Sequence, residues 1–69
     1  MRRYTGRMSG ERYLGNGNKM EVHDLDNEKT TCEIDEIIRA GHARPFNSLP
    51  DAKAQGYDNC AYCLGGSLR

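Results

Sequence analysis

The sequence contains little of the material from which a small protein builds a hydrophobic core. Its 69 residues include no tryptophan and one phenylalanine, and 36% of them are hydrophobic. In a chain of this length the buried area is small compared with the entropy lost on folding. This composition excludes a domain held together by packing alone, so we expect an additional cross-link.

Cysteine is also scarce, and its number limits how the thiols can pair. The chain has three cysteines, so disulfides would leave a thiol unpaired, and no apolar run near Met1 resembles a secretion signal. We therefore expect a cytoplasmic, reducing setting, in which close cysteines more often bind metal than form disulfides. No apolar run is long enough for a membrane span, so we expect no membrane contact.

The formal net charge is zero, but basic and acidic residues lie in different parts of the chain. Residues 1–20 carry five basic residues and one acidic residue, whereas residues 21–36 carry seven acidic residues and one lysine. A basic segment can contact phosphates, although a solvated surface is the more common role of such a charge run. The expected partner is a protein, or a nucleic acid bound through Arg2, Arg3, Arg7 and Arg12.

Local patterns predict an arm and then a hairpin. Residues 1–10 have no period of 2 or 3.6, so we expect a flexible basic arm without a core residue. Runs at 12–15 and 19–23 flank Asn16-Gly17-Asn18, which tolerate the positive φ values of a tight turn and predict a β-hairpin. Its expected inward residues are Leu14, Met20 and Val22, with Tyr13 on the other face.

A capping-box pattern predicts the first helix. Thr30 and Glu33 have the required spacing, and an apolar stripe follows at i, i+3 and i+4. Gly41 is expected to end the helix. The residues of the stripe are Ile34, Ile37 and Ile38.

A second capping pattern, at residues 48–51, predicts a short helix that runs to about Gln55 and ends at Gly56. The segment before it contains Pro45, which is typical of an edge strand, and Phe46, which is expected to anchor the core. The expected inward residues of this second helix are Leu49 and Ala52.

The pair Cys60 and Cys63, in "NCAYCLGG", is the strongest chemical pattern. A tight turn can point both sulfurs of a C-x-x-C at one metal ion, and Gly65 just beyond favours such a turn. The alternatives are a thioredoxin-like redox pair or two inert thiols, but the βαβ context of the redox motif is missing. We therefore expect two metal ligands here.

Two further ligands must come from elsewhere, because structural zinc sites use four. Cys32 is expected in the first turn of a helix, where the helix N-terminus lowers the pKa of a thiol; the alternative is a small buried hydrophobic residue. For the fourth ligand the candidates are His23, His42 or a carboxylate. We favour His23, which ends the predicted hairpin one loop before Cys32; the alternative for this residue is a surface histidine at a strand end. His42 is expected to cap helix carbonyls or to be exposed.

The predicted centre holds one Zn²⁺ per chain, and its Cys3His set favours zinc over iron. Four protein ligands leave no open position, so we expect no catalytic residue and no enzyme activity. The predicted fold class is α+β: a small zinc-stabilised domain with a β-hairpin, a third short strand and two short helices. It occupies residues 11–65, between the flexible basic arm at 1–10 and a flexible C-terminus at 66–69. The predicted ligands are His23, Cys32, Cys60 and Cys63.

The order of these motifs resembles a known family. "RYLGNGNKMEVH", a cysteine at a helix start and "AKAQGYDNCAYC" are similar to the small zinc-binding domain of the Ada methyl-phosphotriester repair protein, in the Cys/His form appended to some bacterial nucleases. The resemblance covers residues 12–64 and implies a small α/β zinc domain with the same four ligands. In Ada all four ligands are cysteines and the first accepts a methyl group from DNA. Here His23 stands first, and a zinc-bound imidazole has no free lone pair.

The leading interpretation is a structural zinc-binding module, a monomer that presents a surface to nucleic acid or to a protein. One alternative is a single-turnover zinc-thiolate methyl acceptor in DNA repair. Another is a redox-responsive switch, in which oxidation of the thiolates ejects zinc and unfolds the domain.

Overall fold

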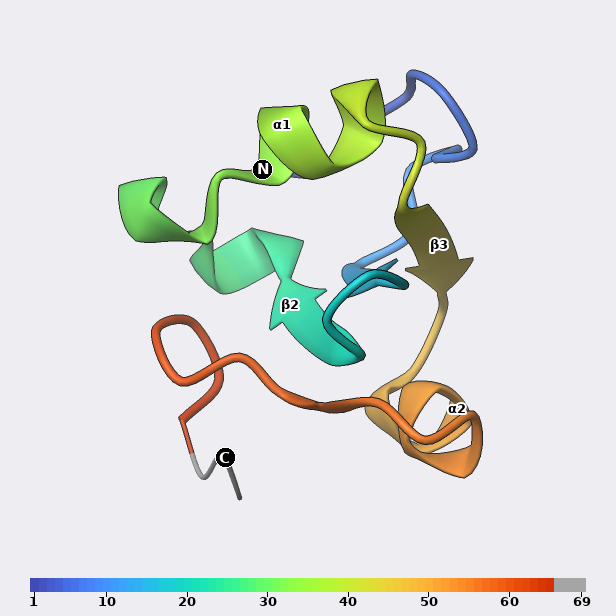
Figure 1. Ribbon diagram of the computed structural model, residues 1–69, viewed down its shortest axis with the longest axis vertical. Coiled ribbons are helices and arrows are strands. Elements are labelled where there is room, and N and C mark those ends of the chain that lie inside the picture. Colours follow the sequence, from blue (N-terminus) through green and yellow to red (C-terminus); the bar gives the residue numbers. More distant parts are fainter. Residues whose placement is uncertain (66–69) are drawn as a thin grey trace.

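A computed structural model describes residues 1–65, so the C-terminus predicted to be flexible, 66–69, lies outside the described residues. A four-stranded mixed sheet of order β3-β1-β2-β4 separates two short helices (Figure 1). The predicted α+β class is therefore confirmed. The elements are β1 Tyr13–Asn16, β2 Glu21–Asp24, the 3-10 helices η1 Leu25–Asn27 and η2 Thr30–Cys32, α1 Ile34–Arg39, β3 Ala43–Phe46, α2 Leu49–Ala54 and β4 Asp58–Asn59.

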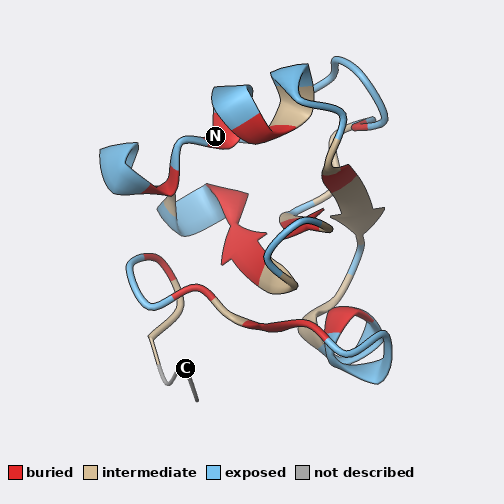
Figure 2. Cartoon of the chain, in the orientation of Figure 1, coloured by how far each residue is buried: buried red, intermediate tan, exposed pale blue. Residues whose placement is uncertain are grey.

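The sheet buries side chains on both of its faces. Leu14 and Val22 are both fully buried, but they belong to different clusters. Val22 pairs with Gly15, the residue after Leu14, and side chains alternate between the two faces along a strand, so the two side chains point to opposite faces. One cluster packs under α1 and contains all three cysteines; the other packs against α2 and contains Tyr57. The buried residues of each helix turn toward the sheet in Figure 2. Each core is small, which agrees with the need for a further cross-link.

The hairpin pairs residues 13–16 with 21–24, close to the predicted runs, and sets Leu14 opposite His23. The prediction that Leu14, Met20 and Val22 share one face, with Tyr13 on the other, was wrong: Leu14 lies in the core under α1, and the other three lie in the second cluster.

The turn of the hairpin also differs from the prediction. The positive φ lies at Met20, at 55°, and not within Asn16-Gly17-Asn18. Asn16 holds the turn instead: its Oδ1 accepts from the Asn18 N–H at 3.0 Å, and its backbone oxygen accepts from the Met20 N–H at 2.8 Å. The prediction of a tight turn was wrong because the asparagine side chain closes a longer connection.

Gly15 lies within β1, where a side chain would have no room. A Cβ at this position would lie 2.7 Å from a ring carbon of Tyr57 and 2.8 Å from one of Phe46. These two rings pack edge to face with their centroids 5.2 Å apart. Gly15 therefore lets the aromatic pair rest directly on the strand backbone.

The predicted capping box at Thr30 and Glu33 is wrong. Thr30 opens η2, and Glu33 adopts the left-handed conformation, with φ 52° and ψ 49°, ahead of α1. In a continuous helix residues 32 and 34 would point about 200° apart. The left-handed residue between them lets Cys32 and Ile34 enter the same core.

The end of α1 agrees with the prediction. Gly41 has a φ of 79°. Its N–H donates to the Ile38 carbonyl, and the His42 N–H donates to the Ile37 carbonyl, which is the Schellman motif. His42 thus caps α1 through its backbone.

The segment from β3 to α2 also follows the prediction. β3, with Pro45, lies at an edge of the sheet. The Ser48 hydroxyl accepts from the Asp51 N–H at 3.3 Å and caps α2. Ala52 is fully buried, and Gly56, with a φ of 88°, follows the helix. These signals are local, which is why the sequence shows them.

β4 was not predicted, and it decides where the C-x-x-C pair lies. It has two residues and pairs in parallel with β2. The Asp58 N–H donates to the Met20 carbonyl and the Cys60 N–H donates to the Val22 carbonyl, each at 2.9 Å. Cys60 is thereby placed beside His23.

Residues 1–10 make contacts that the prediction did not include. Met8 is 2% exposed and belongs to the core under α1, so the expectation that this segment has no core residue was wrong. A single methionine has no periodic neighbour to reveal it, and its flexible side chain fits irregular gaps. The flexibility of the arm stays a prediction. Within residues 1–65 no helix has the length and apolar character needed to cross a membrane.

Candidate metal centre

Three separate segments bring four predicted ligands together. His23 comes from β2, Cys32 ends η2, and Cys60 and Cys63 lie in the turn that follows β4. All four side chains are buried, and their ligand atoms all lie within 4.8 Å of one another. His23 and Cys32 thus come from the middle of the chain and meet Cys60 and Cys63, which lie near its C-terminal end.

The spacing of these atoms suits a tetrahedral ion. The sulfurs of Cys32 and Cys60 are 3.6 Å apart, and the Cys63 sulfur lies 3.8 Å from His23 Nδ1. Zinc–sulfur bonds of about 2.3 Å and zinc–nitrogen bonds of about 2.0 Å put tetrahedral ligand atoms about 3.5 to 3.8 Å apart. All six pairs of ligand atoms lie within 4.8 Å, so an approach of no more than about 1.3 Å between any two of them closes a tetrahedral shell around one ion.

Backbone groups shape the C-x-x-C turn. The carbonyl of Cys60 accepts from the N–H groups of Leu64 and Gly65 at 3.1 and 3.0 Å, and Gly65 has the expected positive φ of 69°. The Asp24 N–H donates to the Cys63 sulfur at 3.3 Å. This N–H would stabilise a thiolate at that position.

Asn27 links the turn to the loop between His23 and Cys32. Its Nδ2 donates to the Cys63 carbonyl at 2.7 Å. This residue was missed at the sequence level, since an asparagine in a polar loop carries no distinguishing signal. Its position in η1 makes it a support for the cluster rather than a ligand.

His23 is prepared to act as a neutral ligand. Its side chain is buried, and burial lowers the pKa of His23 to about 4, so the imidazole is neutral near pH 7. Its Nε2 is buried and has no hydrogen-bond partner among the described residues. A buried nitrogen without a partner costs about 1 to 3 kcal/mol. A metal ion bound by Nδ1, the ring nitrogen 3.8 Å from the Cys63 sulfur, would explain why this imidazole lies among sulfurs.

Burial raises the pKa of two of the thiols, whereas it lowers the pKa of His23. Burial raises the pKa of the Cys32 thiol, and burial raises the pKa of Cys63 to about 12. The prediction that a helix N-terminus lowers the pKa of Cys32 was wrong, because this residue ends η2 and precedes α1. In the metal-free protein both thiols hold their protons near neutral pH.

Zinc affinity is therefore expected to rise steeply between about pH 6 and pH 8. Binding displaces at least two protons, one from Cys32 and one from Cys63, whereas His23 is already neutral. The apparent association constant should increase at least about 100-fold per pH unit. Competition with a chelator of known affinity, repeated across this range, measures the slope, and a slope below one decade per unit would contradict the assignment.

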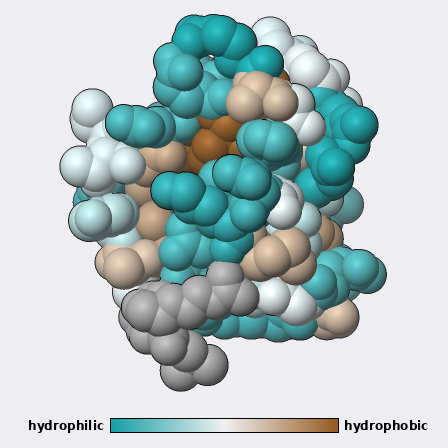
Figure 3. Space-filling model, viewed as in Figure 1, coloured by the Kyte–Doolittle hydropathy of each residue, from teal (hydrophilic) through white to brown (hydrophobic). Residues whose placement is uncertain are grey.

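A surface cavity of about 250 Å³ reaches one side of the cluster. His23, Cys32 and Cys60 line it, and Cys63 is not among its lining residues. On the face shown in Figure 3, apolar surface is recessed between α1 and β2 and hydrophilic residues surround it. The metal centre therefore has an accessible side and a covered side. The acidic residues that line the cavity are Glu21, Glu33 and Glu36.

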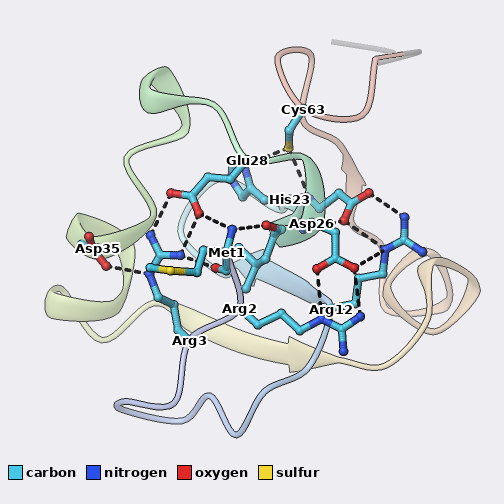
Figure 4. Close-up of polar contacts among 11 residues, drawn as sticks. Met1, Arg2, Arg3, Arg12, His23, Asp26, Glu28, Asp35 and Cys63 are labelled. Carbon is cyan, nitrogen blue, oxygen red and sulfur yellow. Dashed lines mark hydrogen bonds and ion pairs between the residues drawn. The ribbon is translucent and has the colours of Figure 1, made fainter.

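Three of the four arginines expected to contact nucleic acid are paired with carboxylates. Arg2 donates to both oxygens of Asp26, at 3.0 and 2.9 Å, in the network of Figure 4. The hydrogen bond from Arg3, at 2.7 Å, lowers the pKa of Glu28 to about 2. The further pairs are Arg3 with Asp35 and Arg12 with Asp24 and Asp26.

These pairs connect the N-terminal arm to the acidic loop that carries the chain from His23 to Cys32. Arg7 makes no ion pair within residues 1–65. Two of the three arginines in residues 1–10, Arg2 and Arg3, therefore form ion pairs within the domain. No protein-family model, curated protein or solved structure matches the chain.

Proposed function

We propose that this chain is a structural zinc-binding module. The observation that carries the proposal is the convergence of four buried ligand side chains, with atoms within 4.8 Å of one another. Three sulfurs and one imidazole nitrogen form a donor set typical of structural zinc. Four protein ligands leave no open coordination position, which favours a structural role over catalysis.

Zinc would supply the cross-link that the small cores require. The ion would join β2, η2 and the turn after β4 through the imidazole of His23 and the three cysteine sulfurs. Because the unfolded chain has no preformed site, the free energy of binding is released only on folding. Zinc binding would then be part of the folding reaction.

Metal analysis tests this proposal directly. The purified protein is expected to contain close to one zinc ion per chain, and X-ray absorption at the zinc edge should show three sulfurs and one nitrogen. Replacement of zinc by cobalt(II) should give the absorption bands of a tetrahedral thiolate complex. A folded protein without metal, or a coordination shell dominated by oxygen, would sink the proposal.

We further propose that the surface displayed by the module is recognised by a protein. Two features support a protein partner over nucleic acid. Arg2, Arg3 and Arg12 already pair with carboxylates. Zn²⁺ bound by three thiolates carries a net negative charge, and acidic residues line the adjacent cavity. Both features weaken the attraction of phosphates to this face.

Titration with duplex DNA distinguishes the two partners. At about 150 mM salt we expect a dissociation constant at or above about 10⁻⁴ M, the weak end of the range for non-specific contacts. Fluorescence anisotropy with a labelled duplex provides the measurement, and Arg7→Gln serves as the matched variant because this arginine has no ion pair within residues 1–65. Tight binding that weakens steeply with salt and with Arg7→Gln would instead assign the surface to nucleic acid.

The ligand order supports a relationship to the Ada-like zinc domains, which we also propose. The hairpin with His23, the cysteine before a helix and the closing C-x-x-C follow one another in the order of that family's Cys/His form. We do not extend the proposal to methyl transfer, because His23 occupies the position of the accepting cysteine. The bound zinc is expected to stabilise the fold, and no cysteine is expected to accept a methyl group.

A further inference from the structure

Two of the three thiols share the accessible side of the cluster. Cys32 and Cys60 line the cavity of about 250 Å³ together with His23. Cys63 does not line this cavity, and its sulfur faces the Asp24 N–H at 3.3 Å and the His23 ring at 3.8 Å (Figure 4). A small polar reagent that enters this cavity from solvent therefore reaches Cys32 and Cys60, which are 6% and 3% exposed, along its lining.

These two sulfurs are also close enough to join. They are 3.6 Å apart, so a disulfide of about 2.05 Å requires them to approach by about 1.6 Å. Cys32 ends η2 and Cys60 follows β4, so a small shift of either segment suffices. The usual expectation for a C-x-x-C motif, a bond between Cys60 and Cys63, would instead need the sulfur on the covered side.

We propose that the cluster is an oxidation site at which a hydroperoxide joins Cys32 to Cys60 and releases the metal ion. The proposal rests on the metal centre proposed above. One thiolate attacks the peroxide, the O–O bond breaks, and a sulfenic acid forms as hydroxide leaves from hydrogen peroxide, or alkoxide from an alkyl hydroperoxide. The second thiolate attacks that sulfur, the S–S bond forms, and hydroxide leaves. The two sulfurs lose two electrons, and the peroxide with two protons becomes two molecules of water or of water and alcohol.

The consequence is an exchange of one cross-link for another. After oxidation only His23 and Cys63 remain as ligands, which is too few to retain the ion. The new bond joins residues 28 positions apart in the sequence, in the same segments that the metal had joined. A disulfide stabilises by restricting the unfolded chain, so the oxidised domain should stay folded. This differs from a switch in which oxidation unfolds the domain.

The test uses the zinc-loaded wild-type chain and one equivalent of hydrogen peroxide. A chromophoric chelator follows zinc release, and circular dichroism follows the fold. Digestion with trypsin and chymotrypsin without reduction separates the three cysteines, since cleavage after Lys29 and Arg39 isolates Cys32, and cleavage after Tyr62 divides Cys60 from Cys63. Mass spectrometry then identifies which two peptides are linked.

We expect one zinc released per disulfide, a link between the peptides that carry Cys32 and Cys60, and a retained folded spectrum. Cys63→Ser should still form this link, whereas Cys60→Ser should not form it. A predominant Cys60 to Cys63 bond, retention of zinc, or unfolding on oxidation would overturn the proposal. Absence of zinc before peroxide would contradict the metal centre instead, and the peptide map of that chain would still decide which cysteines pair.

Discussion

Removal of zinc by a chelator is expected to unfold the domain. Of the nine buried residues in the core under α1, three are the cysteines of the cluster. Loss of the ion would remove the bonds that hold these three residues together. Structural zinc sites contribute about 10 to 16 kcal/mol at neutral pH. A domain of ordinary stability has only about 5 to 15 kcal/mol to lose.

Far-UV circular dichroism and amide hydrogen exchange would follow this transition after addition of excess chelator. The folded spectrum should return with one equivalent of zinc, and magnesium should not restore it, since Mg²⁺ prefers oxygen ligands in octahedral geometry. Full retention of exchange protection without metal would show that packing alone holds the fold.

Substitution of the two histidines is expected to give opposite results. His23→Ala removes one of the four ligands, and since loss of a mere supporting contact costs about 10- to 100-fold in metal affinity, we expect a loss greater than about 100-fold. His42 caps α1 through its backbone and lies outside the four-residue cluster. His42→Ala should therefore change the affinity by no more than a factor of about two to three.

Competition between each variant and a chromophoric chelator provides the affinities. His23→Cys is the conservative variant, because a fourth thiolate also binds zinc, and it should retain tight binding while His23→Ala does not. Equal losses in His23→Ala and His42→Ala would point to a general effect on folding. Wild-type affinity in His23→Ala would remove this residue from the centre.

Much of the fold is visible in local patterns. The hairpin, the stripe of Ile34 and Ile37, the Ser48 cap and the edge position of Pro45 each depend on residues a few positions apart. Such patterns act through backbone geometry and side-chain alternation, which neighbouring residues determine. The predictions made from these local patterns therefore hold, even though each core is small.

Other features depend on contacts between distant segments. Glu33 takes a left-handed conformation against its capping pattern, because Cys32 and Ile34 must both reach the core. β4 has two residues, too few to form a pattern, and exists because β2 offers an edge. The pairing of Arg2 with Asp26 joins charges 24 positions apart, and no local rule selects that partner.

The amino-acid sequence identifies the donor types and the order of the candidate ligands, because C-x-x-C spacing and a chain too small for a sufficient core point to a metal. The packing of distant segments selects His23, not His42, to meet the three sulfurs, and it places Cys32 and Cys60 in the lining of the cavity. The same packing pairs Arg2 and Arg3 of the arm with carboxylates of the domain, whereas Arg7 makes no ion pair within residues 1–65. The reason is physical: residue types define which bonds can form, but the distances that select among them arise when distant segments pack together.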